Sequence, residues 1–189
     1  ARSLRPTLLF CIPTFYAALC ASELSEDTFS SVRWAVSAAE PLPADTYHRF
    51  EERFGVRILD GIGSTEMTHI YISNSPTALR PGTSGQPVPG YHVEVVDDAG
   101  VPVPADVPGH LEVGGDSMAV GYWCDNAATH HSFRGDRIRT GDMYSCSADG
   151  YSTPGTSTDA TKARPTSTSA PTTTSTSPTA TTSTTATST

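Results

Sequence analysis

The sequence lacks any apolar run that approaches the ~20 residues a transmembrane helix needs. Two arginines precede a short apolar run at its start, but Pro13 interrupts that run and no small-residue cleavage site follows, so we expect no signal peptide. Basic residues are few: 12 Lys and Arg stand against 20 Asp and Glu, and the formal net charge is −8. Nucleic acids and anionic membranes attract basic surfaces. The composition therefore predicts neither a nucleic-acid partner nor a membrane partner.

Cysteine is also scarce. The four cysteines, Cys11, Cys20, Cys124 and Cys146, form no Cys-x-x-Cys pair. Their spacing fits neither a zinc site nor a dense disulfide framework. We expect reduced, partly buried thiols, and hence a cytoplasmic protein.

The C-terminal stretch lacks apolar surface. Residues 166–189 are Thr, Ser, Ala and Pro only, and such a segment cannot offset the entropy of ordering itself. We expect a disordered tail, with an O-glycosylated stalk as the alternative. About 150 residues then remain for a folded core, which is enough for one domain.

The first eighty residues alternate short apolar runs with amphipathic stretches. Their pattern predicts strands at residues 8–12, 32–37 and 56–59 and helices at residues 14–21 and 44–54. Gly55 is placed to end the second helix, and the polar residues 25–31 are typical of a loop. This order of elements favours a mostly parallel sheet with helical crossovers.

Beyond Asn74 glycine and proline become frequent. Short β-rich runs lie at residues 91–96, 109–113 and 137–139, and residues 97–100 form a hairpin-turn signal between the first two. Such spacing favours a small antiparallel sheet or barrel. We therefore divide the chain into an α/β part at 1–80, a β-rich part at 81–151 and a tail at 152–189.

The most informative segment joins a strand to a glycine-rich turn at residues 60–66. Ligands of open α/β sheets bind beyond the carboxyl ends of strands, and glycine lets a backbone approach a base or phosphate closely. The Thr65 hydroxyl can donate to a phosphate oxygen, and the Glu66 carboxylate suits Mg²⁺. The alternative is an ordinary strand-to-helix turn with a capping hydroxyl and a first-turn acid.

Residues 60–66 read Asp-Gly-Ile-Gly-Ser-Thr-Glu, which resembles the signature of the adenylate-forming superfamily. Its usual form is an aromatic residue, Gly, any residue, Thr and Glu. Acyl- and aryl-CoA synthetases, peptide-synthetase adenylation domains and beetle luciferases share it. Ile62 in the aromatic position, followed by Met67 and His69, is similar to benzoate–CoA ligases.

Further blocks resemble the family in its order. They are residues 36–43, 80–90, 109–115 with 121–123, and 139–142, although His110 replaces a usual Glu. The resemblance implies an α/β fold: a fragment of the large N-terminal domain of an adenylate-forming enzyme. Its parts would be a piece of parallel sheet with helices, a small antiparallel β subdomain and the disordered tail.

The resemblance also implies a reaction. A substrate carboxylate attacks the α-phosphate of ATP, pyrophosphate leaves, and coenzyme A captures the acyl-AMP. Thr65 would contact the α-phosphate, Glu66 would hold Mg²⁺, and Asp142 would accept hydrogen bonds from both ribose hydroxyls. The implied nucleotide-binding set is Ala39, Glu40, Asp60, Gly61, Ile62, Gly63, Ser64, Thr65 and Asp142.

The implied substrate is an aromatic or other carboxylic acid, and His69 is its candidate contact. His69 lies three residues after Glu66, about one helical turn, so both could face one cleft. The alternative is a surface histidine. For His130 and His131, near acidic residues, we favour a solvated loop over a metal site. The oligomeric state is left open.

Parts of the family pattern are missing from this sequence. It has no Gly/Ser/Thr-rich phosphate loop with a lysine and no lid with its lysine, and it begins without Met, so we expect missing sequence upstream. Thr156 and Thr158 replace a ribose-binding Arg and a hinge Asp, whereas Asp159 and Lys162 keep the spacing. We expect a truncated, degenerate or frame-altered copy that is inactive alone; the alternative is a non-catalytic nucleotide-binding remnant.

Overall fold

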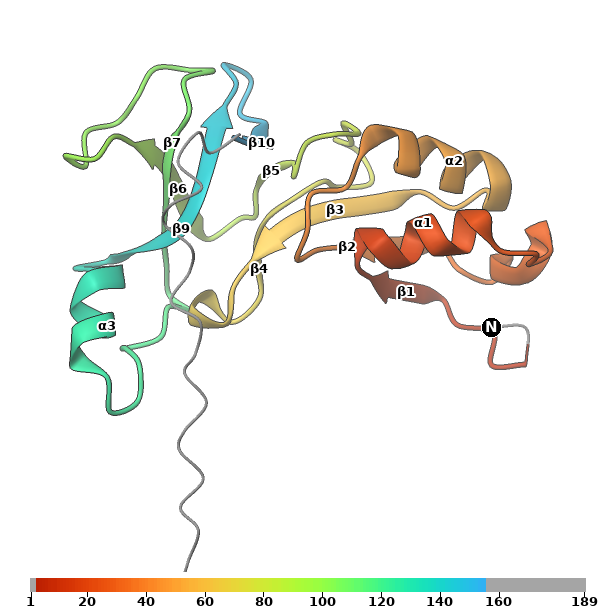
Figure 1. Cartoon of the computed structure of the whole chain (residues 1–189), viewed down its shortest axis with the longest axis horizontal. Helices are drawn as coiled ribbons and strands as arrows, with labels where there is room; N and C mark the ends of the chain where they lie inside the picture. The colour runs from red at the N-terminus through yellow and green to blue at the C-terminus, as the bar shows by residue number, and fades with distance from the viewer. Residues whose placement is uncertain (1–2, 156–189) are drawn as a thin grey trace, which may run out of the picture. The chain divides into compact units, whose positions relative to one another are not determined.

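The computed structural model describes residues 3–155, in which two β-sheets carry three α-helices (Figure 1). The predicted disordered tail and the replacements at residues 156–162 lie outside the described residues. No helix among residues 3–155 is long and apolar enough to cross a membrane. The four cysteines are free, and only Cys124 is exposed.

The first sheet has the order β1-β2-β3-β4-β5. Its strands are β1 (Leu8–Cys11), β2 (Trp34–Ser37), β3 (Ile58–Gly63), β4 (Ile70–Ser73) and β5 (Gln86–Pro87). The first three are parallel, and β4 and β5 continue the sheet antiparallel. The predicted parallel sheet with crossovers is confirmed for β1 to β3, whereas the sequence did not predict β4.

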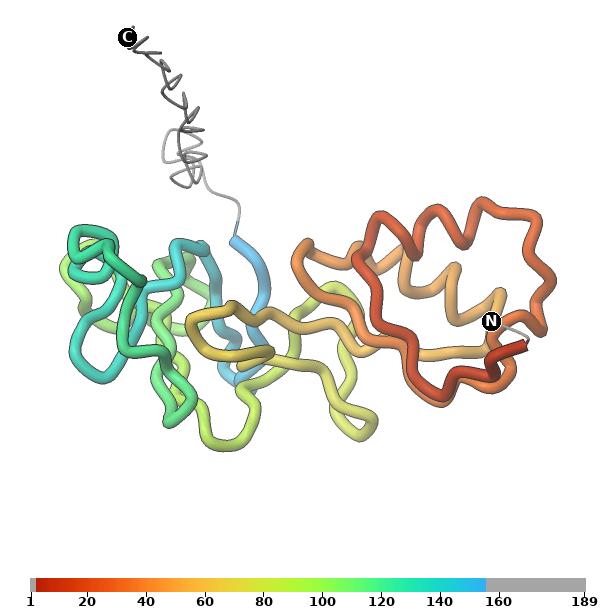
Figure 2. The backbone as a smooth tube through the Cα atoms, turned by 90° about the horizontal axis from the view of Figure 1, so that it is seen from below, coloured from red at the N-terminus to blue at the C-terminus, as the bar shows by residue number. Residues whose placement is uncertain are grey.

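Two helices lie side by side on one face of the parallel strands (Figures 1 and 2). These are α1 (Pro13–Ala21) and α2 (Ala44–Phe54). Pro13 suits the first turn of α1, where its missing N–H would have no helical partner. Gly55 ends α2 at φ 67°, as predicted. The segment expected as a polar loop instead contains a short 3₁₀ helix, Glu26–Phe29, because Phe29 is buried there.

The first core lies between these helices and the sheet. Phe50 is its centre, with ring centroids 4.9 Å from Tyr16 and 5.0 Å from Phe54. The core residues are Tyr16, Phe29, Val32, Ala35, Leu42, Tyr47, Phe50, Phe54, Val56 and Ile58. Tyr47, Phe50 and Phe54 of α2 are three and four residues apart, so they lie on one face of the helix, and that face packs against this core.

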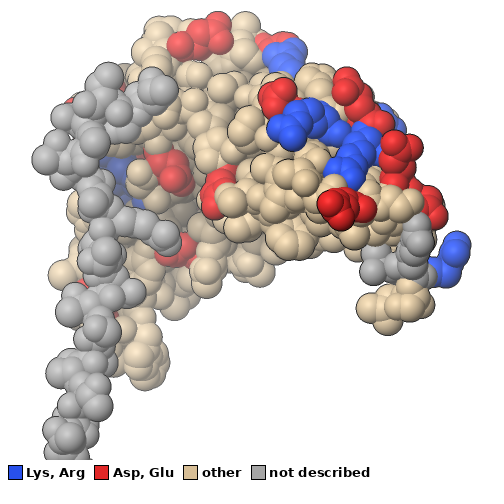
Figure 3. Space-filling model, turned by 45° about the vertical axis from the view of Figure 1, so that its right-hand side comes forward, with Lys and Arg blue, Asp and Glu red and all other residues tan. Residues whose placement is uncertain are grey.

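Arg53 joins the two helices. Its guanidinium donates to four backbone carbonyls at and beyond the end of α1, those of Leu19, Cys20, Ser22 and Leu24. The last carbonyls of a helix have no helical partner, so a cation there is favourable. On the face shown in Figure 3, basic and acidic side chains are interspersed, and Arg49 pairs with Asp45 one turn earlier on α2 at 3.5 Å.

The second sheet is antiparallel, in the order β10-β9-β7-β6 with β8 beside β9. Its strands are β6 (Tyr91–Val96), β7 (Gly109–Gly115), β8 (Phe133–Arg134), β9 (Arg137–Cys146) and β10 (Ser152–Pro154). The predicted β-rich runs are confirmed, and β9 is longer than predicted. A turn forms at Asp97 as expected, because its Oδ1 accepts from the amides of Ala99 and Val101 at 2.9 Å. It leads from β6 to an isolated bridge at Pro102 and not directly to β7, which begins at Gly109.

The second core combines this sheet with residues of the first. Tyr71 and Ile72 of β4 pack with Leu111 and Val113 of β7, and all four are fully buried. The division at residues 80 and 151 stays a prediction.

His130 and His131 lie in α3 (Asn126–Ser132), not in the expected loop. The N-cap of this helix was not predicted: Asp125 accepts from the Ala128 amide at 2.9 Å. Both histidines are exposed, and the described residues contain no group of three or more potential metal ligands.

Candidate functional site

The glycine-rich motif is not the turn that we expected at residues 60–66, because β3 continues to Gly63. The glycines permit close pairing with β4. A Cβ on Gly63 would lie 2.2 Å from the carbonyl oxygen of His69, and one on Gly61 would lie 2.7 Å from that of Ile72. Such separations exclude any side chain. These two glycines are therefore required by the sheet itself.

The turn begins at Ser64 and leads into a 3₁₀ helix, η2 (Thr65–Met67). Thr65 is exposed, Glu66 is half-buried, and Met67 is fully buried in the second core. Burial of Met67 anchors η2 and thereby places the two polar side chains before it at the surface. Thr65 and Glu66 thus stand at the end of β3.

His69 does not follow Glu66 by one helical turn. Thr68 has φ 72° and ends η2, and β4 begins at Ile70. The exposed imidazole of His69 instead lies edge-on to Phe10 of β1, with centroids 5.8 Å apart. The expected helical geometry is wrong because a 3₁₀ helix of three residues cannot reach residue 69.

Asp60 is the most deeply buried acid of the motif, with 6% of its surface exposed. Burial raises its pKa to about 7, against the opposing effects of the Ser37 hydroxyl and the Leu42 and Gly61 backbone. Its Oδ1 has no hydrogen-bond partner among the described residues. At neutral pH this carboxyl therefore exists in both protonation states and can donate or accept a hydrogen bond.

The loop after β2 lies at the surface. Ala39 and Glu40 are exposed. Ala39 has φ 77°, which is unusual for a residue with a Cβ. Glu40 accepts a hydrogen bond from the Thr14 hydroxyl at 2.6 Å, so α1 holds the loop in place.

Two buried phenols connect the acids of the motif with Asp142. Burial raises the pKa of Tyr71, and the charges of Asp142 and Glu66 add to this rise. Burial likewise raises the pKa of Tyr144 to about 12, with contributions from Asp142 and Asp60. Tyr71 of β4 and Tyr144 of β9 belong to one buried cluster, and Ile62 of β3 packs partly against it. The motif and β9 therefore meet at one core.

Asp142 follows an irregularity in the pairing of β7 with β9. Gly141 has φ 87°, and the Asp142 amide donates to the Thr140 hydroxyl at 3.1 Å. This local conformation leaves Asp142 exposed. Its position at a bulge turns a strand residue into a surface acid.

Several buried polar atoms in this region have no hydrogen-bond partner among the described residues. They are Ser37 Oγ, Asp60 Oδ1, Ser64 Oγ, Tyr71 Oη and Ser152 Oγ. An unpaired buried polar group costs about 1–3 kcal/mol. Water could remove that cost. Because these atoms are buried, a nucleotide would reach the exposed side chains of Thr65 and Asp142 instead, whose oxygens fit its phosphates and ribose. For Mg²⁺, Glu66 is the one carboxylate on η2, which suits a cation held jointly with phosphates.

Sequence reasoning missed the tyrosines of this site. Tyr71 lies within β4, Tyr144 bonds to Ser84 at 3.0 Å, and the Tyr122 hydroxyl donates to Glu66 Oε1 at 2.7 Å. Tyr122 belongs to the block at 121–123 that marked the resemblance. That block was the only signal for its role, and nothing in the local pattern pointed to Glu66.

The chain belongs to the AMP-binding enzyme family, whose model matches residues 1–123. It is 46% identical over 151 residues to a 4-hydroxybenzoate–CoA/benzoate–CoA ligase of Rhodopseudomonas palustris, which covers 79% of this chain and 28% of that protein. It is 42% identical to a benzoate–CoA ligase of Thauera aromatica, over 78% of this chain and 28% of that protein. The predicted superfamily is thereby confirmed.

Solved structures give the same family. The anthranilate CoA ligase AuaEII in complex with anthranoyl-AMP matches with a TM-score of 0.78 and 42% identity, over 80% of this chain and 30% of that one. A benzoate CoA ligase from Burkholderia xenovorans matches with a TM-score of 0.76 and 41% identity, over 79% and 31%. The predicted fold class is confirmed. The chain spans less than a third of the length of these relatives.

Proposed function

We propose that this chain forms the AMP-binding part of an AMP-forming aryl–CoA ligase. The enzyme activates an aromatic carboxylate as an acyl-AMP and then transfers the acyl group to the thiol of coenzyme A. The observation that carries this proposal is one buried cluster that contains Met67 of η2, Tyr71 of β4 and Tyr144 of β9. It brings η2, with exposed Thr65 and half-buried Glu66, close to β9, which carries exposed Asp142. A single ligand can therefore contact both elements.

Each residue has a role that its position supports. Exposed Thr65 donates to the α-phosphate, and Glu66 holds Mg²⁺, which neutralises charge on the phosphate oxygens. Asp142 accepts hydrogen bonds from both ribose hydroxyls. Residues Ala39, Glu40, Asp60, Gly61, Ile62, Gly63 and Ser64 border the base and the phosphate.

Asp60 suits the edge of an adenine. Because its pKa is about 7, the carboxyl can donate a proton to a ring nitrogen or accept one from the exocyclic amine. Ile62, which packs partly against the second core, supplies apolar contact without aromatic stacking.

We place the aryl group beside His69 and Phe10. The two rings form an edge contact on exposed sequence, and both are accessible to a ligand. Two relatives bear the names of benzoate ligases, and a third was solved with anthranoyl-AMP, so an aromatic acid is the proposed substrate class. A histidine can bond a ring substituent while Phe10 packs against the ring.

We further propose that the 189-residue chain alone binds nucleotide without useful turnover. The family's lysine-bearing phosphate loop and lid do not occur in this sequence, and loss of one charged transition-state donor commonly costs ~10²–10³ in rate. A non-catalytic nucleotide-binding role is the second candidate, and it rests on the same residues. We assign the protein to the cytoplasm, in keeping with its four free cysteines.

Titration of labelled AMP tests the binding half of this proposal. We expect saturable binding by the native chain and a loss of at least about tenfold in affinity for Asp142→Ala, because one carboxylate makes two charge-assisted bonds. Asp136→Ala, which removes an exposed acid of the same sheet, is the matched control and leaves the affinity unchanged. Equal affinities for both variants would contradict the role of Asp142.

Pyrophosphate exchange with benzoate and ATP tests the catalytic half. We expect no exchange above background with the 189-residue chain, since several transition-state donors are missing from it. A catalytically dead control is provided by Glu66→Gln. Clear turnover by the native chain that Glu66→Gln abolishes would overturn the proposal of an inactive part and establish a complete enzyme.

A further inference from the structure

The segment before α3 packs directly on η2, which carries Thr65 and Glu66. Ser117 Oγ donates to the Met67 carbonyl at 3.0 Å, and the Thr68 hydroxyl donates to the Ser117 carbonyl at 3.1 Å. The Ala119 amide donates to the Glu66 carbonyl at 2.7 Å. Three hydrogen bonds thus hold this segment against the turn, although some fifty residues separate the two in sequence.

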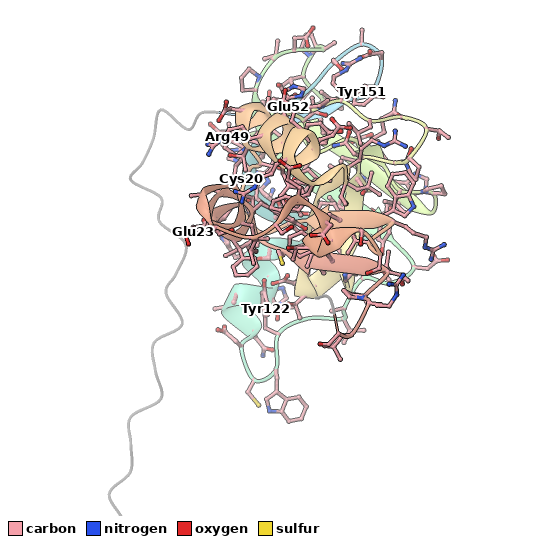
Figure 4. The ribbon with its side chains drawn as sticks, turned by 90° about the vertical axis from the view of Figure 1, so that its right-hand side faces the viewer. Cys20, Glu23, Arg49, Glu52, Tyr122 and Tyr151 are labelled. Carbon is pink, nitrogen blue, oxygen red and sulfur yellow. The ribbon has the colours of Figure 1, made fainter. Side chains whose placement is uncertain are left out.

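Tyr122 completes this contact at the side chain of Glu66. Its hydroxyl donates to Glu66 Oε1 at 2.7 Å, and its ring lies edge-on to Phe133, with centroids 5.5 Å apart. Figure 4 shows Tyr122 on the segment that leads into α3. The same segment therefore holds Glu66 at its backbone carbonyl and at its carboxylate.

The backbone of Tyr122 is itself fixed. Gly121 has φ 151°, and a Cβ there would lie 2.7 Å from Thr129 Cγ2, so this position requires glycine. The Tyr122 amide donates to Thr129 Oγ1 at 2.9 Å, and that hydroxyl donates to the Asp125 carbonyl at 2.8 Å. Residues of α3 and its cap thus determine where the phenol points.

We propose that Tyr122 is a positioning residue that orients the Glu66 carboxylate for a magnesium–nucleotide complex. The inference rests on the proposed function and extends it to a residue outside the nucleotide-binding motif. A neutral phenol suits this task, because it donates one charge-assisted hydrogen bond to one carboxylate oxygen. It fixes the carboxylate plane and leaves its negative charge in place.

The physical reason lies in how carboxylates bind Mg²⁺. The ion demands near-ideal octahedral geometry and keeps most of its water, so a single protein carboxylate must present its oxygen in one orientation. A free glutamate side chain samples several rotamers, and ordering it on binding costs ~1–2 kcal/mol. A hydrogen bond that orders it beforehand lowers that cost. Outer groups of this kind typically change metal affinity 10–100-fold.

The test measures ATP binding by the full chain as a function of Mg²⁺. For Tyr122→Phe we expect the Mg²⁺ concentration at half-saturation to rise about tenfold, while ATP affinity in EDTA is unchanged. Electron paramagnetic resonance of Mn²⁺ in the presence of ATP gives an independent readout, with less bound Mn²⁺ in the variant. Phenylalanine retains the edge contact with Phe133, so the fold should persist.

Tyr91→Phe is the matched control. The hydroxyl of Tyr91, on β6, bonds to Ser117 Oγ at 2.9 Å and to the Met67 carbonyl at 3.2 Å, and so contacts the same segment and η2 without reaching the Glu66 side chain. We expect this variant to leave the Mg²⁺ dependence unchanged. Thr129→Val removes the hydrogen bond to the Tyr122 backbone but keeps the Tyr122 hydroxyl. It should raise the half-saturating Mg²⁺ concentration, but by less than Tyr122→Phe does.

A double-mutant cycle separates positioning from general destabilisation. In a Glu66→Gln background, Tyr122→Phe should no longer alter the Mg²⁺ dependence. If the native chain binds ATP with Mg²⁺ and Tyr122→Phe binds it with the same Mg²⁺ dependence, the positioning role is overturned while the proposed function stands. If the native chain binds ATP neither in EDTA nor with Mg²⁺, both proposals fail.

Discussion

At the scale of single residues, Asp60 is a carboxylic acid that the fold keeps partly protonated at neutral pH. It lies within β3, where the parallel pairing with β2 ends at Ser37, and almost all of its surface is covered. Burial disfavours the charged form because the low-dielectric interior solvates it poorly. The consequence is a folding free energy that depends on pH.

Its sign follows from the raised pKa. Below pH 3.8 the folded and unfolded states are both protonated, and Asp60 costs nothing. As pH rises towards 7 the unfolded state ionises first, so the chain loses stability, and well above pH 7 the loss is constant at roughly 4 kcal/mol. We therefore predict that Asp60→Asn stabilises the chain at pH 8 and leaves it nearly unchanged at pH 4, measured by urea unfolding.

Asp45→Asn is the control for this prediction. Asp45 is an exposed acid on α2 that pairs with Arg49 at the surface, so its removal should change stability little at either pH. If the free energy of unfolding varied with pH in the same way for the wild-type and Asp60→Asn proteins, Asp60 would not be the cause of the pH dependence.

At the scale of elements, the pairing of β3 with β4 determines where the candidate catalytic residues lie. The two strands approach so closely at Gly61 and Gly63 that neither position accommodates a Cβ. The pairing shifts register between Ile62 and Gly63, and the chain then turns at Ser64 into η2. Thr65 and Glu66 are thus placed by backbone contacts that glycine alone permits.

We predict that Gly63→Ala destabilises the chain by about 3 kcal/mol or more, because the new Cβ overlaps the His69 carbonyl oxygen and the strands must separate. Gly55→Ala is the control: its φ is 67° but no atom lies within 4 Å of the new Cβ. Only backbone strain then remains, about 1–2 kcal/mol. Urea unfolding measures both, and equal losses would argue against a steric requirement at Gly63.

At the scale of the described molecule, an ion pair and several hydrogen bonds join residues 80–86 to the turn between β9 and β10. Arg80 pairs with Asp149 and stacks over the Tyr151 ring at 3.8 Å. The Gln86 side chain donates to the Asp149 carbonyl at 2.9 Å, and Ser84 and Gly85 exchange backbone bonds with Ser152. These contacts hold Ser84 beside Tyr144, and so support the buried phenols of the site.

The Arg80–Asp149 pair predicts a second pH dependence, of opposite sign. The hydrogen bond from Arg80, and a further one from Ser147, lower the pKa of Asp149 to about 2. The pair therefore contributes stability above pH 3.8 and loses it as pH falls towards 2. We expect Asp149→Asn to lower the Tm by a few degrees at pH 7 and by less below pH 3. In an Arg80→Gln background the substitution should have a smaller effect, because only the hydrogen bond from Ser147 then remains, and an undiminished effect there would exclude the pair as its cause.

Local sequence by itself determined much of this protein. The bounds of α2, its end at Gly55 and the strand β6 agree with the periodicity and turn chemistry of adjacent residues, which act over a few positions. The family was likewise evident from short blocks, because each block is a contiguous run of residues that can be recognised without knowledge of the fold. The AMP-binding match then confirmed it.

Only the tertiary structure decided how those blocks combine into a site. It showed that Gly61 and Gly63 serve the pairing with β4, that His69 lies against Phe10, and that Tyr122 reaches Glu66 across 56 positions of sequence. It also brought Tyr71 of β4 into one core with Tyr144 of β9. Such contacts depend on which strands pair and how deeply side chains are buried. No stretch of neighbouring residues encodes either property, because both arise from packing between distant parts of the chain.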